Sequence, residues 1–154
     1  MEKFLENLQK AQKIITSIDH MFYVTFPLIK DKRILIKILL ETKTAIANCI
    51  NSILQYDYLY KKINLYSKPE ENFRTFSKKS APRYNITEPE INSIKELFNI
   101  VEKHKQSTFE FIKNDKIIIL SENLKPESIT FEKTKQFLIL GKNILRKTQK
   151  GILG

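Results

Sequence analysis

Apolar residues recur every three or four positions along most of this chain, the spacing of one face of an α-helix. In the first segment they form the stripe Phe4, Leu8, Ala11, Ile15, Ile18 and Phe22. Pro27 and the polar residues 30–32 then mark the end of this element, or a kink followed by a turn. The pattern predicts a long first helix.

A second, longer stripe predicts a helix from about residue 32 to about residue 63. Its inward face is Leu35, Ile38, Thr42, Ala45, Cys49, Ser52 and Tyr56. Ile46 and Ile53 flank this face, and we expect both to be buried in the core. The small residues in its middle would let a neighbouring helix approach closely. Two long helices joined by a short turn indicate an antiparallel hairpin.

The character of the sequence changes between about residues 66 and 86. Pro69 and Pro82, with polar residues between them, argue against a regular element and predict a long central loop. A loop of this length in a compact domain is either functional or disordered. It is therefore where we expect function to lie.

A third helix is expected to begin at Thr87, which can form a capping box with Glu90, and to continue to about His104. The period then changes from helical to alternating. Phe109, Phe111 and residues 116–120 predict a small β-hairpin with its turn at 113–115, with a short helix as the alternative.

Residues 123–128 are expected to form a connector, and Thr130 to cap a last helix over about residues 131–149. The predicted fold is mainly α. It is an antiparallel bundle of four main helices with a long central loop (about 66–86) and a small β-hairpin before the last helix. The chain has 154 residues, which fits a single domain over 1–154.

The chain carries 27 Lys and Arg against 17 Asp and Glu, a net charge of +10. Such an excess favours anionic partners: nucleic acid, an acidic protein or an anionic membrane surface. A competing explanation is an A+T-rich genome, because the codon usage of such genomes enriches lysine.

Several kinds of chemistry have no support in the sequence. The single cysteine, Cys49, lies in an apolar helical stripe and is expected to fill space. The sequence has no CxxC pair or His/Cys cluster for a metal, and no glycine-rich phosphate loop for a cofactor. We predict no metal and no cofactor. The acidic, interrupted start and the lack of a long apolar run predict a cytoplasmic protein without a membrane partner.

The segment 73–84 combines cations and aromatic rings without an acidic residue. Its candidate nucleic-acid-binding residues are Arg74, Lys78, Lys79, Arg83 and Tyr84. Phosphates attract the cations and bases can stack on aromatic rings, as single-stranded RNA contacts require. The alternative is that the aromatic side chains pack the segment onto the helices and the cations are merely solvated.

Two further groups have weaker patterns. In the last helix, Lys135, Lys142 and Arg146 can share a basic face, although a solvated lysine face is the simpler interpretation. Asp19 and His20 resemble an acid/base pair, but consecutive residues on a helix point about 100° apart. We therefore expect His20 to be a structural, half-buried residue, and we predict no catalytic residue.

Two long N-terminal helices followed by a later helix pair resemble the HEPN superfamily, whose members include RNA-cleaving toxins and inactive scaffolds. The catalytic signature of that family, Arg followed four to six residues later by His, does not occur before His20 or His104. The resemblance implies a noncatalytic or diverged member. The stretch from Asp19 to Asp31 is also similar to small archaeal helical proteins.

Three functions follow from these patterns. The first is a nonenzymatic RNA-associated or ribonucleoprotein factor that uses the cations of segment 73–84. The second is a bundle for dimerisation or for binding another protein, indicated by the long stripes and small residues of the second helix. The third is a diverged HEPN-like ribonuclease using Asp19, His20 or Arg83.

Overall fold

A computed structural model describes residues 2–106, 109–113, 116–120 and 126–154. Helix α1 (Lys3–His20) buries the predicted apolar stripe, including Leu8, Ala11, Ile15 and Ile18. It continues through a π-helical turn, η1 (Met21–Thr25), into the short α2 (Phe26–Ile29), where Pro27 lies in the first turn. The first helix therefore runs past Pro27 and ends at Lys30, which has a left-handed φ of 57°.

Helix α3 (Arg33–Leu59) is the longest element and the centre of the core. Ile46 and Ile53 are fully buried, which confirms the prediction for these two side chains. Cys49 is also buried, and burial raises the pKa of its thiol to about 12, as expected of a packing residue rather than a nucleophile. The helix ends about four residues before the predicted boundary, where Lys61 turns the chain with a φ of 59°.

The prediction of an irregular loop over residues 66–86 is wrong. Most of this segment forms three consecutive short helical elements: α4 (Pro69–Thr75), the π-helical turn η2 (Phe76–Ser80) and the 3₁₀ turn η3 (Ala81–Tyr84). Both prolines lie in the first turn of a helical element, where a missing N–H costs no hydrogen bond. The prolines start helical turns here and do not break them.

Helix α5 (Glu88–Gln106) begins with the predicted capping box, since the Glu90 amide donates to Thr87 Oγ1 (3.3 Å) and the Thr87 amide donates to Glu90 Oε1 (2.9 Å). Strands β1 (Phe109–Lys113), β2 (Lys116–Leu120) and β3 (Pro126–Ile129) form an antiparallel sheet in the order β1-β2-β3. Part of the predicted connector is thus a third strand. Residues 114–115, part of the predicted turn, lie outside the described residues.

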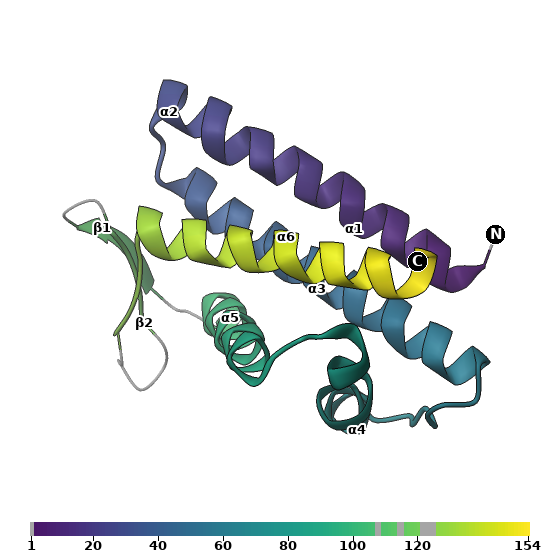
Figure 1. Cartoon of the computed structure of the whole chain (residues 1–154). Helices are drawn as coiled ribbons and strands as arrows, with labels where there is room; N and C mark the ends of the chain where they lie inside the picture. Colours follow the sequence, from purple (N-terminus) through teal and green to yellow (C-terminus); the bar gives the residue numbers. More distant parts are fainter. Residues whose placement is uncertain (1, 107–108, 114–115, 121–125) are drawn as a thin grey trace.

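Helix α6 (Phe131–Leu153) begins at Thr130, whose Oγ1 accepts the Lys133 amide at 3.0 Å. It packs on both α1 and α3 (Figure 1). The close approach depends on Gly141, because a Cβ there would lie 3.0 Å from Ile15 and 3.2 Å from Thr42. The small residues Ala45, Cys49 and Ser52 are buried within the chain's own core.

The molecule is mainly helical, as predicted. The predicted antiparallel arrangement of four helices is not what is seen: α1 runs opposite to α3 and α6, whereas α5 is seen nearly end-on in the view where those three lie across the page (Figure 1). The short elements α4, η2 and η3 lie beside α5 and the second half of α3. Among the described residues, no helix is long and apolar enough to span a membrane.

Candidate functional site

A buried carboxylate at the end of α3 holds the second connection in place. Asp57 is 1% exposed, and three donors from η2 and η3 reach it. Ser80 Oγ donates to Oδ2 (2.7 Å), Arg83 Nη2 donates to the same oxygen (2.5 Å), and Tyr84 Oη donates to Oδ1 (3.1 Å). A buried charge is tolerated only when it is paired and hydrogen-bonded in this way.

Two of the predicted RNA-binding residues therefore have a structural role. Burial and the neighbouring Asp57 carboxylate raise the pKa of Tyr84 well above its usual value. The residue is 5% exposed, so its ring offers little surface on which a base could stack. Arg83 can still contact a ligand, because its side chain remains 36% exposed while it is paired with Asp57.

The other three predicted residues, Arg74, Lys78 and Lys79, are all exposed. The aromatic rings between them pack inward: Phe76 is fully buried, and the half-buried Phe73 lies 6.1 Å from Phe98 of α5. The aromatic part of the alternative prediction is thus confirmed. The segment presents its cations to solvent, and of the two Phe rings only the half-buried Phe73 remains partly accessible.

Arg83 meets the last helix at a basic pocket of about 440 Å³. The pocket is lined by Arg83, Tyr84, Asn85, Arg146, Lys147, Lys150 and Gly151. Spacings of four and three place the cations of α6 on one face of its last turns. We call this the basic pocket; it joins parts of two cationic segments that lie about 60 residues apart in the sequence.

The cations of the basic pocket differ in how they are paired. Lys147 Nζ donates to the Asn85 carbonyl (2.8 Å) and to Glu90 Oε1 (2.5 Å), and Arg83 is paired with Asp57. Arg146 contacts only the neutral Asn143, at 3.4 Å, and Lys150 has no carboxylate partner within the described part of the chain. Two of the four positive charges are therefore uncompensated.

Sequence reasoning missed both Asp57 and the meeting of Arg83 with α6. A signal for Asp57 existed, because it follows Ile53 by four residues and so lies on the same inward face of the helix. An acid in that position needs a partner. No local pattern could have joined Arg83 to residues 146–150, since their contact depends on how the helices pack.

The predicted acid/base cluster is not assembled. His20 is exposed, which corrects the expectation of a half-buried residue. Asp19 forms an ion pair with Lys142 of α6, and the same ammonium lies 5.2 Å from the centre of the Tyr23 ring. The charge of Lys142, one of the three cations of the predicted basic face, is thereby neutralised. Among the described residues, no group of His, Cys, Asp or Glu side chains could hold a metal ion.

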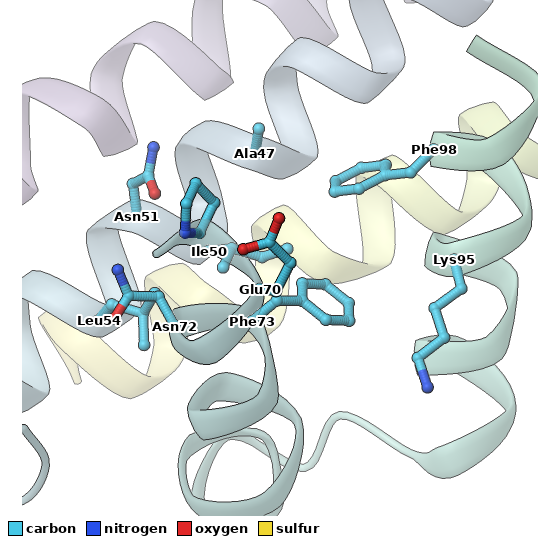
Figure 2. Close-up of a pocket in the computed structure, with 10 residues that line it drawn as sticks. Ala47, Ile50, Asn51, Leu54, Glu70, Asn72, Phe73, Lys95 and Phe98 are labelled. Atoms are coloured by element: carbon cyan, nitrogen blue, oxygen red, sulfur yellow. The ribbon is translucent and has the colours of Figure 1, made fainter. Parts of the chain in front are cut away.

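A second hollow, the apolar groove, lies between α3, α4 and α5 and has a volume of about 610 Å³. Figure 2 shows Phe73 and Phe98 pointing toward a common space over Ala47 and Ile50, with Lys95 extending away along α5. Asn51, Leu54, Pro69, Glu70 and Asn72 complete the lining. Such a volume and lining suit an apolar side chain or small molecule.

Comparison with models of known protein families gives no match, and comparison with curated proteins gives none either. The resemblance to the HEPN superfamily therefore stays a prediction.

Proposed function

We propose that this protein is a nonenzymatic RNA-associated factor that holds phosphate groups in its basic pocket. The observation that carries the proposal is the convergence of Arg83 with Arg146, Lys147 and Lys150 in one concave site. Cations held close together in a hollow attract an anion more strongly than the same charges spread over a convex surface.

The geometry gives each cation a different part in binding. Arg146 and Lys150 supply the uncompensated charge. Arg83 is held by Asp57, so its guanidinium can meet a phosphate with little loss of side-chain freedom. Since Tyr84 is buried, no ring in the pocket reads a base, and binding should depend weakly on sequence.

The exposed Arg74, Lys78 and Lys79 add a second cationic surface, which suits a polymer with many phosphates better than a single anion. The net charge of +10 supports the same interpretation.

The test is the affinity of the purified protein for single-stranded RNA at about 50 and 200 mM salt. If four phosphates are contacted, the affinity should fall about 50-fold over this range, from a log–log slope of about −0.7 per phosphate. Undetectable or salt-insensitive binding would contradict the proposal.

Two sets of variants separate the two cationic surfaces. One changes Arg74, Lys78 and Lys79 to Ala, and the other changes Arg146 and Lys150 to Ala. None of the five is paired with a carboxylate in the described structure, so neither set should impair folding. The second set should weaken binding more and reduce the salt slope by about 1.4. A larger loss of affinity from the first set would mean that the main RNA-binding site lies on α4 and η2 and not in the basic pocket.

A second candidate function is self-association or protein binding, favoured by the apolar groove of Figure 2. Ala47→Asp would place a charge in this groove, whereas Thr44→Asp places one on an exposed part of the same helix. If the groove mediates a dimer, sedimentation should show that only Ala47→Asp dissociates it. A wild-type protein that stays monomeric at every concentration would exclude dimerisation through the groove.

A further inference from the structure

We infer that the basic pocket selects a terminal phosphomonoester, at the end of an RNA strand or on a free nucleotide, over the phosphodiesters inside a strand. This inference rests on the proposed function, since it names the group that the same pocket would hold. It comes from the charge balance of the pocket and from its shape.

The charge balance fits a dianion. The pocket is lined by four cations, and two of them are neutralised: Arg83 by Asp57 and Lys147 by Glu90. The remaining charge is about +2, from Arg146 and Lys150. A phosphomonoester carries about −1.5 to −2 at pH 7, whereas a phosphodiester carries a single negative charge. Only the monoester balances the pocket.

One electrostatic effect acts in the opposite direction. The pocket lies beside the last turn of α6, where the helix macrodipole is equivalent to about half a negative charge. This repulsion is smaller than the attraction of two full positive charges held on the same turn. Attraction and repulsion both scale with the ligand's charge, so the net attraction remains and is larger for a dianion than for a monoanion.

The shape of the pocket also favours a strand end. Tyr84 and Gly151 form one side, and a Cβ at position 151 would overlap the Tyr84 ring, so the helix and the ring are already in close contact there. The ring is fixed by its hydrogen bond to Asp57. An internal phosphate brings a nucleotide on each side into this concave site, whereas a terminal phosphate has one neighbour or none and enters more easily.

The donors available suit this group. The Arg146 guanidinium can donate two parallel N–H groups to two phosphate oxygens, and the Lys150 ammonium can approach a third. The exposed N–H groups of Arg83 lie in the same pocket. A terminal phosphate offers three such oxygens and a diester offers two.

The experiment compares one single-stranded RNA sequence in three forms: with a 5′-phosphate, with a 3′-phosphate, and with hydroxyl groups at both ends. A nucleoside monophosphate is titrated alongside. We expect at least one phosphorylated end to bind about tenfold more tightly than the hydroxyl form, the size of one charge-assisted hydrogen bond. This preference should disappear when Arg146 and Lys150 are changed to Ala.

The matched control changes Lys37 and Lys135 to Ala, which removes the same charge near the starts of α3 and α6, far from the pocket. That variant should keep the preference. Equal, salt-dependent binding of all three strands would overturn the inference and leave the proposed function standing. Tight binding of the monophosphate without binding of any strand would support the phosphomonoester site and overturn the RNA function. No binding by any ligand would overturn both.

Discussion

Helix α3 holds its two neighbouring regions by opposite kinds of interaction. Along most of its length it packs on α1 and α6 through aliphatic side chains, with Ile38, Ile46 and Ile53 fully buried. At its last turn it holds η2 and η3 through the Asp57 carboxylate and its three donors. Apolar packing is nondirectional, whereas the hydrogen bonds of Asp57 fix particular atoms in place. The second kind is what a binding site needs, and it positions Arg83.

Among the variants considered, Asp57→Ala should lower the free energy of unfolding most, because it removes the polar interactions at the end of α3. It removes the shared acceptor of Ser80, Arg83 and Tyr84 and leaves buried donors without a partner. We expect a loss of about 3–5 kcal/mol in the free energy of unfolding, measured by urea denaturation. A loss below about 1 kcal/mol, the size of an exposed ion pair, would contradict a structural role for Asp57.

Ile46→Ala tests the apolar region. The side chain is fully buried, so its truncation should cost about 2–4 kcal/mol in the free energy of unfolding. Thr44→Ala, at an exposed position of the same helix, is the control and should change stability by less than about 0.5 kcal/mol. An equally small loss for Ile46→Ala would show that the inward face of α3 is misassigned.

These two variants also separate stability from positioning. Under conditions where both are folded, Asp57→Ala should weaken RNA binding because Arg83 is no longer held. Ile46→Ala should leave the affinity unchanged. If the two variants lowered the affinity equally, Asp57 would act on binding only through stability.

Gly151→Ala tests the contact between α6 and the Tyr84 ring. Two effects oppose one another: alanine improves helix propensity by about 1 kcal/mol, and overpacking costs about 1–3 kcal/mol. The Tyr84 ring is hydrogen-bonded to Asp57, so moving it to make room would cost free energy. We therefore expect the free energy of unfolding, measured by heat or urea, to fall by about 1 kcal/mol. Leu153→Ala, which is 63% exposed, should leave stability unchanged. A stabilised Gly151→Ala protein would mean that the ring moves freely.

The sequence predicted the features that depend on local periodicity. It did not predict the features that depend on contacts between residues far apart in the chain. The stripes of α1 and α3 and the caps at Thr87 and Thr130 follow from spacing and side-chain chemistry, and all are present. The segment over 69–84 has no clear period, because it consists of three short helical elements of different pitch. The basic pocket needs Arg83 beside Arg146, a contact that only the packed structure supplies.

Glu90→Gln should have the smallest effect on stability and a distinctive dependence on pH. Burial raises the pKa of Glu90, but its bonds to Lys147 and Thr87 outweigh burial, and the net pKa is lowered. A carboxyl whose pKa falls on folding stabilises the protein above its unfolded pKa of about 4.3, and that contribution is lost as pH falls through the folded value. The difference between wild type and Glu90→Gln should be about 0.5–1 kcal/mol at pH 7 and should vanish in acid. Glu88→Gln, at an exposed position in the same turn, is the control.

The same substitution should act oppositely on binding. Without the Glu90 carboxylate, Lys147 is no longer neutralised, and the charge of the basic pocket rises from about +2 to about +3. We therefore expect Glu90→Gln to bind a phosphorylated RNA end more tightly although the protein is less stable, whereas Glu88→Gln should change neither property. Weaker binding by Glu90→Gln would mean that Glu90 matters to the site by positioning Lys147, and that the position of this ammonium outweighs the added charge.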